Sequence, residues 1–140
     1  MPGKCSESDA RRVADGIRRR VLEHTVRNDG GYLSQACSSA EILAALYTAI
    51  LRIDMPQAPI APRRYAGTPG PGNDAYMTGA DFNGGVRDDR DRFSLSPTHY
   101  SLVLYAALIE TGRMTADGLD LFNRDGSSVE MIGAEHSPGM

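Results

Sequence analysis

Histidines are the residues of this chain best suited to proton transfer and to binding anions. His99 follows Ser-Pro-Thr at the predicted start of a helix. Free backbone N–H groups and the helix dipole favour anions there, phosphate included. His136 lies in the loop-like sequence GAEHSPGM, where a histidine is either functional or a surface residue, and His24 falls near the end of a predicted helix and is interpreted as structural. The sequence therefore offers His99 and His136 as candidate functional residues.

A pair of glycines is the second feature that suits a binding site. Gly30 and Gly31 follow Asn28-Asp29 and break the first predicted helix. Such a pair lets the backbone turn sharply or lets a ligand approach closely. The chain contains no phosphate-binding loop, dinucleotide-binding glycine motif, HExxH, GxSxG or zinc-type cysteine cluster, so we predict no metal ligands in it. These patterns alone indicate an α/β domain that binds an anion.

The element expected to position His99 is the stretch 91–112, DRFSLSPTHYSLVLYAALIETG. Phe93 and Leu95 alternate with a serine, which predicts a short, half-buried strand. Ser96 and the proline after it predict the N-cap and first position of a helix. The nearly continuous apolar run 102–108 predicts that this helix is buried, and Gly112 provides its end.

Two further helices are expected before this stretch. The first begins after Ser6 or Ser8 and runs to about Asn28, with Val13, Ile17 and Val21 in its apolar stripe, which Ala10, Ala14 and Leu22 widen. The second begins at Ser38, which has capping-box spacing to Glu41, and continues to Ile53. Its sequence is apolar almost all round, which places it in the core.

The remaining segments are predominantly loops. Residues 54–92 contain five prolines and six glycines and form one long irregular segment, which is typical of a functional, disordered or partner-bound loop. A short helix is expected over 115–123, followed by a turn at Asp125-Gly126 and a last short strand formed by Val129, Met131 and Ile132.

Composition narrows the class of protein. The 140 residues suit one domain, and 41% apolar with 24% charged residues is close to a globular average. A net charge of −3 gives no footprint for nucleic acid or for an anionic membrane. The apolar runs are shorter than the roughly 20 residues that span a bilayer, and we predict no signal sequence in the first residues.

Cys5 and Cys37 lie far apart, so we expect free thiols, no disulfide and a cytoplasmic location.

Two stretches resemble a known superfamily. DRFSLSPTHYSLVLYAALIETGRM is similar to the transketolase segment DRF-x-LS-K-G-H with its apolar helix. GGYLSQACSSAEILAALYTAILRI resembles the transketolase segment that carries SGHPGG and a DILAALY-like helix, and its small polar run is closer to the homodimeric pyruvate dehydrogenase E1 component. The helix IRRRVLEHTV is similar to the opening helix of both. The resemblance implies that residues 1–140 are the helix-rich, N-terminal part of a thiamine diphosphate-binding domain of α/β class, with the long loop 54–92 inserted.

The resemblance also assigns roles to residues. His99 matches the histidine of the K-G-H motif, which lies near thiamine diphosphate, although Pro-Thr replaces Lys-Gly here. Gly30 and Gly31 fall in the cofactor-binding segment. Tyr32 takes the place of a catalytic-pocket histidine, and a phenol is a poorer proton shuttle than imidazole at neutral pH. His136 stands near the region of the family's G-H-P and PGV segments, with compressed spacing.

The function implied is that of an N-terminal subunit or fragment. The family's GDG…N motif for magnesium and its pyrimidine-binding domain do not occur in these residues, so partner chains are expected to supply them. The assembled, oligomeric enzyme would transfer a two-carbon unit from a ketose or 2-oxo acid to an acceptor, and the isolated chain would be inactive. The alternative is a non-catalytic assembly module or a truncated remnant of such an enzyme. A third interpretation is a free-standing anion-binding domain.

Overall fold

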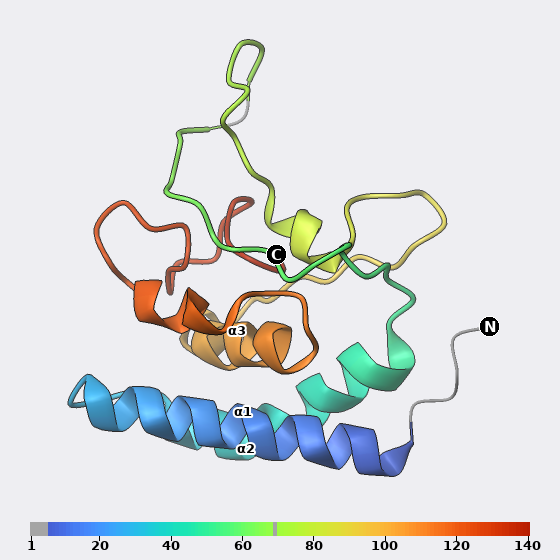
Figure 1. Cartoon of the computed structure of the whole chain (residues 1–140), viewed down its shortest axis with the longest axis vertical. Helices are drawn as coiled ribbons and strands as arrows, with labels where there is room; N and C mark the ends of the chain where they lie inside the picture. Colours follow the sequence, from blue (N-terminus) through green and yellow to red (C-terminus); the bar gives the residue numbers. More distant parts are fainter. Residues whose placement is uncertain (1–5, 69) are drawn as a thin grey trace.

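The fold is a small set of helices covered on one side by long loops. A computed structural model describes residues 6–68 and 70–140, so Cys5 lies outside the described residues. The helices are α1 (Glu7–Arg27), α2 (Leu33–Ala45) and α3 (Ser101–Glu110). α2 continues into a π-helical turn, η1 (Leu46–Ile50), and three 3₁₀ turns follow: η2 (Gly79–Asn83), η3 (Thr98–Tyr100) and η4 (Ala116–Leu121). α1 and α2 lie side by side along one edge of the molecule, and α3 lies between them and the loops (Figure 1).

α1 forms as its sequence predicts. Ser6 accepts a hydrogen bond from the Asp9 backbone N–H, and the Asp9 carboxylate accepts one from the Ser6 N–H, which is a capping box. Val13, Ile17 and Val21 are buried, so the predicted stripe is confirmed. Leu22 is 48% exposed and therefore lies outside that stripe.

α2 begins five residues earlier than predicted. Its first residue is Leu33 and the N-cap position is Tyr32, so the predicted start at Ser38 is wrong. Ser38 lies inside the helix, where its hydroxyl donates to the Gln35 carbonyl at 3.2 Å. No glycine or proline interrupts residues 33–37, so the helix extends back through them. The prediction that this helix lies in the core is confirmed for one face, where Ala40, Leu43 and Ala44 are buried, and is wrong for Ile42, which is 61% exposed.

α3 is the buried centre of the fold. Each of its residues from Ser101 to Ile109 is buried, which confirms that neighbours cover it on every side. Its predicted start at Ser96 and Pro97 is wrong: η3 comes first, and the Ser101 hydroxyl donates to the Thr98 carbonyl at 2.6 Å. Gly112 follows the helix with a φ of 73°, which confirms the predicted end.

The two predicted strands are absent from the described residues. Those residues contain only isolated bridges, Ile60 with Met114 and Arg64 with Ser127. Phe93 and Leu95 are half-buried and alternate with an exposed serine, but no neighbouring backbone pairs with them. The segment 129–132 is likewise irregular. The helix-rich part of the fold prediction is confirmed, and the α/β class is not confirmed.

The long loop is irregular as predicted, and it packs against the C-terminal segment. The Gly79 N–H donates to the Glu135 carbonyl at 2.6 Å, and the Gly139 N–H donates to the Gly79 carbonyl at 2.9 Å. A Cβ atom on Gly79 would lie 1.8 Å from the Ser137 carbonyl oxygen. This close approach requires glycine at residue 79. η4 and the turn at residues 125 and 126 follow α3 as the sequence predicts, although η4 is a 3₁₀ helix.

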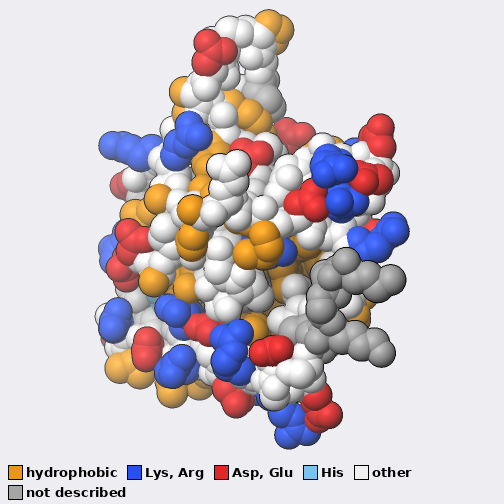
Figure 2. Space-filling view, turned by 45° about the vertical axis from the view of Figure 1, so that its right-hand side comes forward, with side chains coloured by type: hydrophobic (Ala, Val, Ile, Leu, Met, Phe, Trp, Pro, Cys, Tyr) orange, Lys and Arg blue, Asp and Glu red, His pale blue; other side chains and the backbone are white. Residues whose placement is uncertain are grey.

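The surface mixes charges of both signs, and several apolar side chains are exposed on it. Arg, Asp and Glu side chains are interspersed over the face shown in Figure 2. Among the large apolar residues, Val26 is 74% exposed, Ile132 is 70%, and Ile42 and Ile50 are 61% each. No helix in the described part of the chain has the length and apolar character to cross a membrane.

Candidate functional site

Two neighbouring hollows contain most of the predicted functional residues. The first has a volume of about 580 Å³ and is lined by Tyr65, Asn123, Arg124, Asp125, Gly126, Ser127, Glu130 and His136. The second has a volume of about 420 Å³ and is lined by His24, Asn28, Gly30, Gly31, Tyr32, Phe122, Asn123 and Arg124. Asn123 and Arg124 line both hollows, so the two lie on either side of one short segment.

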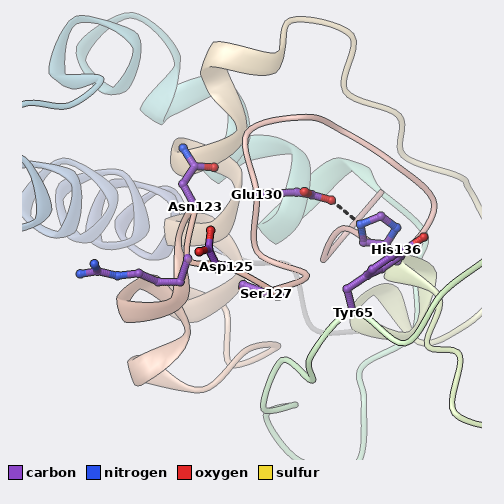
Figure 3. A pocket seen from close by; sticks show the side chains of 8 residues that line it. Tyr65, Asn123, Asp125, Ser127, Glu130 and His136 are labelled. Atoms are coloured by element: carbon purple, nitrogen blue, oxygen red, sulfur yellow. Dashed lines mark hydrogen bonds and ion pairs between the residues drawn. The ribbon is translucent and has the colours of Figure 1, made fainter.

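His136 is held in the first hollow by contacts on two sides. Its Nε2 atom forms a short contact with Glu130 Oε1, and the Glu130 side chain points at the ring in Figure 3. The Tyr65 ring packs against the imidazole with centroids 4.6 Å apart and an angle of 49°. The histidine therefore has one ring nitrogen on a carboxylate and one ring face on an aromatic side chain.

The long loop brings Tyr65 to this position. The Tyr65 N–H donates to the Gly126 carbonyl at 2.8 Å, and the Ser128 hydroxyl donates to the Arg63 carbonyl at 2.7 Å. The bridge between Arg64 and Ser127 lies between these two bonds in the chain. Residues 63–65 are thus fastened to residues 126–128, a contact that spans about half the chain.

Backbone hydrogen bonds also hold the Glu130 segment. The Tyr105 hydroxyl, on buried α3, donates to the Glu130 carbonyl at 2.5 Å. The Met131 N–H donates to Asn123 Oδ1, and the Asn123 N–H donates to the Val129 carbonyl, both at 2.9 Å. Asn123 has a φ of 53°, a left-handed conformation that asparagine tolerates better than most residues. The carboxylate that contacts His136 therefore projects from a fixed backbone.

Tyr32 occupies the second hollow. Its hydroxyl donates to the Met131 sulfur at 2.8 Å. Since Met131 adjoins Glu130, residues 130 and 131 contact both predicted catalytic residues, Tyr32 and His136. The two side chains do not contact each other in the described structure, and they face adjoining hollows.

The two glycines serve different purposes. Gly30 has a φ of 153°, and a Cβ atom there would meet no atom within 4 Å, so its backbone borders open space. A Cβ on Gly31 would lie 2.3 Å from the Thr25 hydroxyl oxygen, so Gly31 is required for close packing. Of the pair, Gly30 is the one that leaves room for a ligand.

His99 is not brought to this region. It is exposed in η3 and lines neither hollow. Its ring contacts the neighbouring Tyr100, with centroids 5.4 Å apart. η3 leads directly into α3, so His99 lies in the 3₁₀ turn at the start of that helix, as predicted, but away from both hollows.

Sequence reasoning did not identify several residues that line the first hollow. Glu130 falls within the predicted last strand, and Tyr65 falls in the long loop, for which the sequence predicts no specific contact. Asp125 gives only a turn signal in the sequence. The one available signal was the density of polar residues between Asn123 and Glu130, NRDGSSVE, just before the candidate histidine.

The set of contacts limits the chemistry of the first hollow. The Ser127 hydroxyl accepts the Val129 N–H at 2.9 Å, and no hydrogen bond joins Ser127 to His136 in the described structure. The cluster is therefore not arranged as a serine nucleophile with a base. No group of three or more His, Cys, Asp or Glu residues within 6–68 and 70–140 is placed to hold a metal ion. The arrangement suits acid–base chemistry by a histidine.

His24, in the second hollow, should make stability depend on pH. Burial lowers its pKa below the ordinary value, and the Arg124 and Arg27 cations act in the same direction while Asp120 opposes them. Near pH 6.5, His24 therefore binds a proton more readily in the unfolded chain than in the folded chain. The stability from neutral His24 is fully present above about pH 6.5 and is lost as pH falls towards the lower, folded pKa.

We expect a loss below about 1 kcal/mol from this residue, because it is only half-buried. Urea unfolding at pH 7.5 and pH 5.5 measures it in the wild type and in His24→Gln. The wild type should lose more stability on acidification than the variant. Equal losses in the two proteins would show that His24 does not titrate differently on folding.

Two curated proteins that are similar to this chain are both named as transketolases. No protein-family model matches the chain. A transketolase family protein of Sinorhizobium fredii is 32% identical over 127 residues, which covers 87% of this chain and 36% of that protein. The 6-deoxy-6-sulfo-D-fructose transketolase subunit SqwG of a Clostridium species is 31% identical over 121 residues, covering 86% of this chain and 34% of that subunit. The chain spans about a third of the length of these relatives, and its resemblance to the transketolase superfamily is confirmed.

Proposed function

We propose, from this similarity to transketolase-family proteins, that the chain is the N-terminal part of a thiamine diphosphate-dependent transferase. The assembled enzyme takes a two-carbon unit from a ketose or 2-oxo acid and passes it to an acceptor. Partner chains supply the rest of the diphosphate-binding domain and the pyrimidine-binding domain, and the complex is cytoplasmic and oligomeric. The chain without its partner subunits does not catalyse this transfer.

The observation that carries this proposal is the sequence similarity to two transketolase-family relatives over most of the chain. One of them is named as a transketolase subunit, so a division of the enzyme between chains has a precedent in its name. The exposed Ile42 and Ile50 are apolar surface that a partner chain would cover.

The second hollow fits part of the cofactor. Gly30 leaves open space there and Arg124 brings a cation. The Asn28 amide donates one N–H to the His24 carbonyl at 2.8 Å and has a second N–H, so the set suits a diphosphate oxygen. The described residues offer no cluster of metal ligands, so we assign the magnesium ligands to the partner. His99 is exposed and lines neither hollow, so we assign it no contact with the cofactor within this chain.

Thiamine diphosphate supplies the electron sink for carbon–carbon bond cleavage when it is bound. The roles of this chain are to bind, orient and transfer protons. The Tyr32 hydroxyl, whose proton is donated to the Met131 sulfur, can accept a hydrogen bond from the ligand, and His136 holds or accepts a proton beside Glu130. Gly30 lets the ligand approach the backbone closely.

Calorimetric titration of thiamine diphosphate and magnesium tests the proposal. The chain alone and the chain mixed with the candidate partner subunit are compared, and turnover is assayed with a ketose donor. We expect tight, magnesium-dependent binding and turnover only in the mixture. If the mixture neither binds the cofactor nor turns over, the proposal is wrong.

A non-catalytic assembly module is the second candidate function. It is favoured by the exposed apolar side chains of Val26, Ile42 and Ile50, which suit docking. Sedimentation and thermal unfolding of the chain alone test it. A monodisperse monomer that melts cooperatively would argue against a chain whose purpose is to dock.

A further inference from the structure

We propose that Glu130 is a positioning residue for His136: its carboxylate accepts a hydrogen bond from Nε2–H, which keeps that proton on Nε2 and leaves Nδ1 as the basic nitrogen. The inference rests on the proposed proton-transfer role of His136 and adds the residue and ring atom through which that role is set. The observations that carry it are the Glu130–His136 contact, the anchored backbone below it and the Tyr65 ring beside it.

The chemistry of the two partners fixes the direction of the hydrogen bond. An ionised carboxylate only accepts, so the ring nitrogen that contacts it must carry the proton. The contact is made by Nε2 of His136 and Oε1 of Glu130. Within the described residues Nδ1 has no hydrogen bond, so it is the nitrogen left to accept a proton from a ligand. The imidazolium that results is balanced by the Glu130 charge.

Both side chains are held so that this geometry persists. The side chains of His136 and Glu130 are 18% and 31% exposed, so water competes only in part. Tyr105 anchors the Glu130 carbonyl from the buried α3, and Tyr65 limits rotation of the imidazole on its other side. Ser137, directly after His136, is fully buried, which fixes the backbone of the histidine as well.

The competing interpretation is a clasp with no chemical role. A Glu–His contact across a loop also stabilises that loop, since the two residues lie six positions apart near the C-terminus. A clasp requires only that the charges attract, whereas positioning requires the proton to stay on Nε2. The two interpretations therefore differ in the state of the ring, which nuclear magnetic resonance reads directly.

The test uses the full chain with ¹⁵N-labelled histidine. In the wild type we expect a His136 Nε2–H signal that survives exchange with water. It should disappear in Glu130→Leu, which removes the acceptor, and exchange at least about tenfold faster in Glu130→Gln, where a neutral oxygen accepts a weaker bond. Glu135→Leu, at an exposed neighbouring carboxylate, is the matched control and should leave the signal unchanged.

A second measurement uses the assembled enzyme. There we expect Glu130→Gln to lower kcat about tenfold or more, with KM unchanged, because the residue acts through His136. A neutral ring with its proton on Nδ1 instead of Nε2 in the wild type, a signal that persists in Glu130→Leu, or an unchanged kcat would each overturn the inference. Ring spectra are recorded without cofactor, so they report on Glu130 even if thiamine diphosphate does not bind. A failed cofactor titration alone would count against the proposed function only.

Discussion

Replacing Leu104 with alanine is expected to lower the free energy of unfolding by about 3–5 kcal/mol. Leu104 is fully buried in the middle of α3, and α3 packs against α1 and α2. The shortened side chain gives up its transfer free energy and leaves a cavity that surrounding helices fill only in part. A loss of this size is a large share of the stability of a domain, which is typically about 5–15 kcal/mol.

Urea unfolding followed by circular dichroism measures this loss. Ile42→Ala is the matched control, because Ile42 is a large aliphatic residue on a helix but is 61% exposed, and we expect it to cost less than about 1 kcal/mol. Leu104→Met, which nearly conserves volume, should cost less than about 1.5 kcal/mol. Equal losses for Leu104→Ala and Ile42→Ala would contradict the central place of α3 in the core.

Replacing His136 with glutamine is expected to lower kcat of the assembled enzyme by about 100- to 10,000-fold. An amide at residue 136 can still donate a hydrogen bond to Glu130, so the loop should keep its structure. The amide has no nitrogen that accepts a proton, so the acid–base step proposed for this residue is lost. Affinity for thiamine diphosphate should stay within about twofold of the wild type, since His136 lies outside the Gly30 hollow.

Steady-state kinetics and cofactor titration of the variant with its partner subunit measure both quantities. Glu135→Gln changes an exposed neighbouring residue and should retain wild-type turnover. Turnover by His136→Gln at the wild-type rate would remove His136 from the mechanism. It would leave the similarity to the transketolase superfamily untouched.

Local sequence patterns predicted the helices well where neighbours along the chain are sufficient. The apolar stripe of Val13, Ile17 and Val21 gives the buried face of α1, and Ser6 begins that helix through its own side chain. Gly112 ends α3 because glycine adopts a positive φ at low cost. These features depend on contacts within a few residues, so the sequence contains them.

Two predictions were wrong because they depend on parts of the chain outside the pattern itself. Phe93 and Leu95 have the alternation of a strand, and they are half-buried as a strand would be, yet a strand also requires a second backbone to pair with. Ser38 and Glu41 have the spacing of a helix start, but the same spacing occurs inside α2, where the helix had already begun. A short pattern cannot show what precedes it or lies across from it.

The sequence by itself offered His99, His136, Gly30 and Gly31 as candidates by their chemistry, and a resemblance to a superfamily added Tyr32. Only the tertiary structure decided which side chains lie beside these residues. It placed Glu130 on His136, brought Tyr65 from the long loop, and left His99 exposed away from both hollows. The reason is physical, because these contacts are made by backbone hydrogen bonds between segments far apart in the chain, and no spacing along the sequence encodes which segments meet.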